Sequence, residues 1–205
     1  ISQEGRPGPV LIDIPMNLQR KIIDPKKLKS FYVKKKSIKK QKLINQINKI
    51  LSHLKKSKRP AIIIGGGIRI SKTNKELLVF LKGINVPLIT TWSGVDAITH
   101  DHKNYIGNVG VYGSRAANFV IQNSDFVLSL GSRLDTRVTG GIPKNFARNA
   151  IIASIDIDKN ELNKNRGLEI KIKINESLKD FFNYFIKLSK NKIIDKPEWV
   201  EKSIL

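Results

Sequence analysis

The apolar positions of the chain fall into short unbroken runs that alternate with stretches of helical spacing. Short apolar runs are typical of strands buried on both faces, and spacings of three and four residues are typical of amphipathic helices. The alternation predicts an α/β fold: an open doubly wound (Rossmann-like), mostly parallel sheet of about five to six strands with helices on both faces. We expect strands at residues 61–64, 86–91, 126–130, 150–157 and 170–174, and helices after Ser37, before Gly83, at 114–122 and at 178–188.

Side-chain spacing also predicts which residues face the core. In the helix after Ser37, the inward positions are Ile44, Ile47, Leu51 and Leu54, and in the helix before Gly83 they are Leu77, Leu78 and Leu81. Residues 92–113 and 132–148 are rich in polar residues and glycine, so we expect loops there, with a helical turn at 161–165.

The apolar run at residues 10–14 predicts one more strand, which stops at Pro15. The residues that follow have no clear period, and we interpret them as a linker. The predicted organisation is therefore the end of one domain at 1–15, a linker at 16–36, a central domain at 37–190 and a second linker at 191–205. Because the sequence begins at Ile1 without a start methionine, we expect it to be a fragment of a longer protein.

Charge is concentrated in one part of the chain. The formal net charge is +21, and residues 20–59 hold 16 Lys and Arg residues against one acid, Asp24. Only Phe31 and Tyr32 interrupt these cations with aromatic rings, so the stacking surfaces of a nucleic-acid-binding protein are missing. We interpret the segment as a solvated surface and expect no nucleic-acid partner. A polyanion-binding site remains the alternative, and it would lose affinity steeply with salt.

Two absences narrow the class of protein further. The chain has no cysteine, which excludes disulfides and thiolate metal sites. No apolar run approaches the roughly 20 residues that cross a bilayer. We expect no membrane partner and a cytoplasmic location.

Polar and glycine-rich residues follow four of the predicted strands or precede a helix. Gly65–Gly67 can bring backbone N–H groups to a phosphate or form a plain tight turn. The Gly110–Ser114 loop, with Gly113, leads into a helix and offers either an anion site or an ordinary cap. Residues 131–141 place Arg133 and Arg137 around Asp135, which suits bidentate phosphate binding or a surface ion-pair cluster. Asp135 can orient the arginines or accept a ribose hydroxyl.

The fourth place is Asp156-Ile157-Asp158, where Asp156 suits a ribose hydroxyl and Asp158 a helix cap. His100 and His102 flank Asp101, which we interpret as a solvated turn rather than a metal site. No Ser-His-Asp or paired-carboxylate arrangement is present. The residues alone predict a nucleotide-binding domain with neither a catalytic group nor a metal ligand.

A resemblance to a known family lies in the N-terminal segment. Residues 5–15 read GRPGPVLIDIP, which closely resembles the motif that closes the first, pyrimidine-binding domain of thiamine-diphosphate enzymes. The following segments resemble the central domain of the acetolactate synthases in order: the glycine triplet, TTWSG at 90–94, the loop at 110–114, GSRLDTRVTG at 131–140 and SIDID at 154–158 with Glu161. The resemblance covers about residues 4–190.

This resemblance implies a structural FAD in the domain and a whole enzyme that joins or decarboxylates 2-oxo acids such as pyruvate. The resemblance puts thiamine diphosphate and Mg²⁺ outside this chain, together with the glutamate that activates the thiamine and the GDG…N motif. It also implies a homodimer or tetramer. The positions that it assigns to FAD are Arg6, Gly65, Gly66, Gly67, Thr91, Gly113, Gly131, Arg133, Asp135, Arg137, Val138, Asp156 and Ile157.

The chain departs from the synthase pattern at several of these segments. Met16 replaces a lysine of the substrate channel, Thr136 the second aspartate of RFDDR, and Tyr112 the histidine of GMHG, while Ile174-Asn175 replaces Gly-Asp. These departures indicate a substrate that is different from, or a substrate range that is broader than, that of a housekeeping synthase. An FAD-free thiamine-diphosphate lyase or decarboxylase, or a stand-alone nucleotide-binding module, remains the alternative.

Overall fold

The computed structural model describes residues 2, 5–32, 40–164, 166–189 and 193–204, and its contacts divide the chain into two compact units, Ile1–Ile38 and Lys39–Leu205. The predicted cap Ser37 lies outside the described residues. None of the described helices is long and apolar enough to cross a bilayer.

The first unit contains two short helical elements, α1 (Met16–Gln19) and η1 (Pro25–Lys27), and every described residue in it is exposed. The strand predicted at residues 10–14 is wrong: this segment has no regular structure, and Leu11 is 93% exposed. A strand needs a neighbouring strand to share its hydrogen bonds, and the described residues of this unit provide none.

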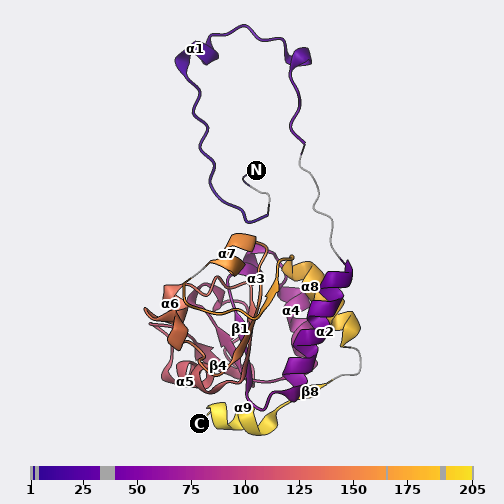
Figure 1. The fold of residues 1–205 in the computed structure, drawn as a ribbon, viewed down its shortest axis with the longest axis vertical. Helices are drawn as coiled ribbons and strands as arrows, with labels where there is room; N and C mark the ends of the chain where they lie inside the picture. The colour runs from indigo at the N-terminus through magenta and orange to yellow at the C-terminus, as the bar shows by residue number, and fades with distance from the viewer. Residues whose placement is uncertain (1, 3–4, 33–39, 165, 190–192, 205) are drawn as a thin grey trace. The chain divides into compact units, whose positions relative to one another are not determined.

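The second unit is built on a six-stranded parallel sheet, which confirms the predicted α/β fold (Figure 1). In spatial order the strands are β4 (Tyr105–Asn108), β3 (Leu88–Thr90), β1 (Pro60–Ile64), β5 (Phe126–Leu130), β6 (Ile151–Ile155) and β7 (Ile172–Ile174). The chain runs outward from β1 to β3 and β4, then returns to the other side of β1 and continues through β5, β6 and β7. The two directions diverge between β1 and β5, and ligands of doubly wound sheets bind at such a switch point, at the carboxyl ends of the strands.

Helices cover both faces of this sheet. Figure 1 shows α2 (Lys40–Lys56), α4 (Asn74–Leu81) and α8 (Leu178–Leu188) together on one side and α5 (Arg115–Asn123) on the other. On the first side, the ring of Phe80 lies 4.7 Å from that of Phe185. On the second, Val120 of α5 packs with Ile63 and Val127 of the central strands. Both faces are therefore dry, as the unbroken apolar strands require.

Some helix positions differ from the expectation. Leu78 is 51% exposed and does not face the core, because it lies beside Leu77 on a helix that buries Leu77, Phe80 and Leu81 instead. In α2 the buried face is Leu43, Ile47, Ile50, Leu51 and Leu54, with Ile44 only half-buried at its margin.

Several segments expected to be irregular contain strands or helices. Within 92–113 the edge strand β4 forms, and the expected loop at 132–148 contains two short helical elements. The strand expected at 86–91 is shorter, as β3, and a separate short strand, β2 (Ile84–Asn85), precedes it. Residues 191–205, interpreted as a linker, contain β8 (Ile194–Asp195), paired with β2, and α9 (Pro197–Ile204). The helix packs against the sheet because Trp199 is buried and donates its indole N–H to the Pro60 carbonyl at 3.1 Å.

The remaining short elements are α3 (Gly67–Ile70), η2 (Trp92–Gly94), α6 (Thr136–Thr139), η3 (Pro143–Asn145) and α7 (Lys159–Asn163).

Candidate functional site

The candidate site is the rim formed where strands β1, β3, β5 and β6 end. Twelve of the thirteen predicted positions lie in the segments that follow these strands or β4. Arg6 belongs to the first unit, so its part in the site stays a prediction.

The glycine-rich turn after β1 packs directly against the turn after β5. A Cβ at Gly65 would lie 2.3 Å from the carbonyl oxygen of Gly131, and one at Gly67 would lie 2.8 Å from it. The N–H groups of Gly65 and Gly67 donate to the carbonyls of Leu130 and Gly131, both at 2.9 Å. These two N–H groups therefore bind backbone rather than point to a ligand, and close packing of the two turns explains why glycine is required.

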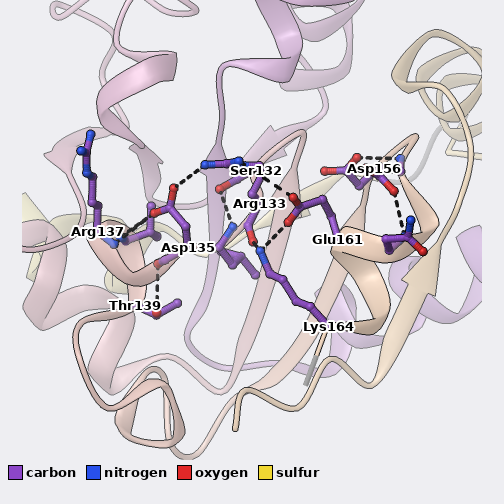
Figure 2. A network of polar contacts seen from close by, with 12 residues as sticks. Ser132, Arg133, Asp135, Arg137, Thr139, Asp156, Glu161 and Lys164 are labelled. Carbon is purple, nitrogen blue, oxygen red and sulfur yellow. Dashed lines mark hydrogen bonds and ion pairs between the residues drawn. The ribbon is translucent and has the colours of Figure 1, made fainter. Parts of the chain in front are cut away.

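In the turn after β5, Arg133 lies at the centre of a network of polar contacts (Figure 2). The Asp135 carboxylate accepts the N–H groups of Arg137 and Val138 at 3.1 and 3.3 Å, which caps α6, and pairs with the Arg133 guanidinium at 3.2 Å. Both roles occupy its oxygens with protein donors. Of the two predicted roles for Asp135, the geometry favours orientation of Arg133 over acceptance of a ribose hydroxyl.

The same network reaches α7. Glu161 lies 3.9 Å from the Arg133 guanidinium and 2.5 Å from the Lys164 ammonium, and Lys164 also donates to the Arg133 carbonyl. Figure 2 shows Glu161 and Lys164 next to Arg133, on the opposite side from Asp135. The resemblance assigned no role to this lysine, and no sequence pattern pointed to it.

Arg137 and Val138 line a cavity of about 300 Å³ beside the rim. Arg137 is exposed, and its guanidinium has no ion-pair partner among the described residues. Sequence reasoning assigned no ligand to the other lining residues: Trp92, Val95, Asn108, Val109 and Tyr112. Trp92 and Tyr112 meet edge to face, with ring centroids 5.3 Å apart, although they are 66% and 73% exposed. The sequence signal that could have identified Trp92 and Tyr112 is an aromatic residue close to a glycine in a predicted polar loop.

Thr91 and Gly113 are the sequence neighbours of the lining residues Trp92 and Tyr112. Thr91 is buried, and its N–H donates to the Ile64 carbonyl at 2.9 Å. A Cβ at Gly113 would lie 2.3 Å from the Asn108 carbonyl oxygen. Ser114 caps α5 by accepting the Ala117 N–H at 3.1 Å, which favours the ordinary cap for this loop.

The turn after β6 is also fixed by local bonds. Asp156 accepts the Asp158 N–H at 2.8 Å, and Asp158 accepts the Asn160 N–H at 2.8 Å at the start of α7, as predicted for a cap. The Ile157 carbonyl accepts the Asn175 amide at 2.7 Å, which leaves the Ile157 side chain 41% exposed at the rim.

Outside the rim, His100 and His102 flank Asp101 in a loop between β3 and β4. Among the described residues, no group of three or more His, Cys, Asp or Glu could hold a metal ion. Burial, followed by the charge of Lys103, lowers the pKa of His102. Its Nδ1 then accepts the Asn104 N–H at 3.2 Å, which a neutral ring allows.

Comparisons with known proteins match this chain to one family of enzymes. The sequence profile of the thiamine pyrophosphate enzyme central domain matches residues 47–182. The chain is 35% identical, over 98% of its length, to the probable acetolactate synthase large subunit of Methanococcus aeolicus, of which it covers 35%. It is 32% identical, over 98% of its length, to the acetolactate synthase large subunit of Lactococcus lactis, of which it covers 34%.

A third relative is the large subunit of acetolactate synthase isozyme 2 of Escherichia coli, 32% identical over 84% of the chain and covered to 30%. The chain thus spans about a third of the length of these relatives. With the profile match across most of the sheet, the chain belongs to the thiamine pyrophosphate enzyme family, as a central domain of the acetolactate synthase large-subunit type.

Proposed function

We propose that this domain binds FAD, or a related adenine nucleotide, across its rim as a structural cofactor. The observation that carries the proposal is the exposed Arg137, which lines a cavity together with Trp92 and Tyr112. A second exposed arginine, Arg133, lies four residues earlier in the same turn. Arginine forks suit a diphosphate, and an aromatic-lined cavity suits a flat ring. The donor set therefore fits FAD, whose role here would be to hold the rim segments together.

The whole protein, on this proposal, is a thiamine-diphosphate-dependent transferase that joins or decarboxylates 2-oxo acids such as pyruvate. This domain would bridge the catalytic domains of a homodimer or tetramer in the cytoplasm. Among the described residues, no group of three metal-binding side chains is present. On this proposal, other parts of the protein bind thiamine diphosphate and Mg²⁺ and supply the catalytic steps.

One observation favours the second candidate, an FAD-free lyase or decarboxylase domain. The N–H groups of Gly65 and Gly67 and the carboxylate of Asp135 already have partners within the protein. A rim with so many occupied groups leaves ligand binding to the arginines and to the cavity.

Calorimetric titration of the folded chain with FAD, with ADP as a second ligand, tests the two candidates. We expect saturable binding that Arg133→Ala weakens strongly. Binding should be unchanged by Arg148→Ala, which removes another exposed arginine outside the network. If the folded wild-type chain gives no heat with FAD or ADP, the FAD proposal fails and the FAD-free candidate stands.

A further inference from the structure

The turn that carries Arg133 is held in an unusual backbone conformation. Leu134, which follows Arg133, has a φ of 46°, in the left-handed region that branched L-residues rarely adopt. Its side chain is only 3% exposed, so burial fixes the residue in this conformation. Such a turn persists only where several contacts determine it together, and it tends to occur where a functional group must be aimed.

Three contacts hold the turn in this backbone conformation. The Ser132 hydroxyl accepts the Leu134 N–H at 3.2 Å, and the Asp135 carboxylate caps the next helix. The third contact comes from outside the turn, where the Lys164 ammonium donates to the carbonyl of Arg133 itself.

Lys164 differs from most lysines of this basic chain in being largely removed from water. Its side chain is 17% exposed, and Glu161, at 16%, anchors its ammonium at 2.5 Å. A charged donor held by a partly buried carboxylate makes a stronger hydrogen bond to a carbonyl than a mobile surface lysine does. The ammonium thus fixes the backbone from which the Arg133 side chain starts.

We propose that Lys164 is a positioning residue for anion binding, and that it acts through Arg133. By holding the Arg133 carbonyl, it keeps the guanidinium at the rim between Asp135 and Glu161, ready for the diphosphate of a nucleotide. This inference rests on the proposed nucleotide-binding function. It predicts that Lys164 contributes to affinity without touching the ligand.

A double-mutant cycle tests the inference. Dissociation constants for FAD and ADP are measured for the wild-type chain, Lys164→Met, Arg133→Ala and the double variant. The matched control is Lys159→Met, which removes the same charge from the exposed first residue of α7, the helix that Lys164 directly follows. The thermal midpoint of each variant shows whether it is folded.

We expect Lys164→Met to weaken binding of both ligands about tenfold, the loss typical of one charged hydrogen bond. Lys159→Met should change affinity less than about twofold, since its charge is far more screened. In the Arg133→Ala background, Lys164→Met should have almost no further effect, because the side chain that it positions is gone. Lys164→Arg, which keeps a charged donor, should restore most of the affinity.

Equal losses from Lys164→Met with and without Arg133 would overturn the inference and indicate a direct or long-range charge effect instead. Equal losses from Lys164→Met and Lys159→Met would overturn it as well. If Lys164→Met does not fold, the comparison rests on Lys164→Gln, and unchanged affinity in that variant overturns the inference while leaving the proposed function intact. Absence of binding by the wild-type chain overturns the proposed function first.

Discussion

The Asp135 carboxylate joins two structural tasks in one side chain. It closes the first turn of α6 and also pairs with Arg133. Helix capping needs only an oxygen acceptor, whereas the pairing needs a negative charge. Substitutions that differ in these two properties can therefore separate the tasks.

We expect Asp135→Ala to lower the free energy of unfolding by about 1 kcal/mol, because the N–H groups at the start of α6 lose their acceptor. Asp135→Asn keeps an acceptor oxygen and should lose much less. Urea unfolding of both variants measures the difference. Equal losses would mean that the ion pair, and not the cap, dominates the stability of this turn.

The contact between Gly65 and Gly131 is decided by the backbone alone. A Cβ at Gly65 would meet carbonyl and Cα atoms that cannot rotate away, whereas one at Gly83 would have no atom within 4 Å. Neither Gly65 nor Gly83 has a φ in the left-handed region, so the two positions differ only in the space around them.

Gly65→Ala should accordingly destabilise the domain by about 1–3 kcal/mol through overpacking, and Gly83→Ala should be close to neutral. Thermal or urea unfolding of the two variants gives the comparison. A near-neutral Gly65→Ala would show that the turns after β1 and β5 can move apart.

Among the elements, α9 contributes a large side chain to a core that is otherwise built by earlier segments. Trp199 packs with Ala61, Val120 and Val127 and bonds the carbonyl of Pro60, the first residue of β1. The last helix thereby closes the α5 face of the sheet.

Trp199→Ala should destabilise the second unit by about 3–5 kcal/mol, because it leaves a cavity and an unpaired carbonyl. Trp199→Phe should recover most of the packing but not the hydrogen bond. Urea unfolding followed by far-ultraviolet circular dichroism measures both losses, with Glu198→Ala as the exposed control on the same helix. A loss below 1 kcal/mol for Trp199→Ala would contradict the packing of α9.

How far the sequence predicted these elements depended on how each one is buried. The strands β1, β3, β5 and β6 were predicted from apolar runs, because each lies between two other strands in the interior of the sheet. The edge strand β7 was predicted as well, within residues 170–174. The edge strand β4 was not predicted, because all four of its residues are half-buried and one of them is Gly107. The helix α9 was not predicted either, because Trp199 and Val200 are its only buried apolar residues and the residues around them are mostly polar.

The sequence predicted where the candidate site lies but not all of its residues. Strand ends, glycines and arginines located the rim, because parallel strands bring their carboxyl ends to one edge. Lys164 and the aromatic pair of Trp92 and Tyr112 were not predicted as site residues, since their roles depend on contacts between segments distant in sequence. Equally, no pattern showed that the Gly65 and Gly67 N–H groups already have backbone partners.

For the molecule as a whole, the two units differ sharply in how they are built. Every residue of the buried hydrophobic core lies between Leu43 and Val200, while the described residues of the first unit are all exposed. The first unit is also rich in lysine and arginine, with five such residues in exposed positions between Arg20 and Lys29.

That contrast determines where a protease cuts. Trypsin cleaves after lysine and arginine in segments that can enter its active site, and exposed chain without regular hydrogen bonding is cut first. Brief digestion should remove the exposed N-terminal segment and leave a resistant fragment that begins near Lys40 and keeps the circular dichroism of a parallel α/β sheet. Mass spectrometry of the fragment identifies its ends, and an early cut within residues 60–130 would contradict the arrangement. The digest would yield a compact fragment for crystallisation, with an N-terminal boundary that is defined by resistance to the protease.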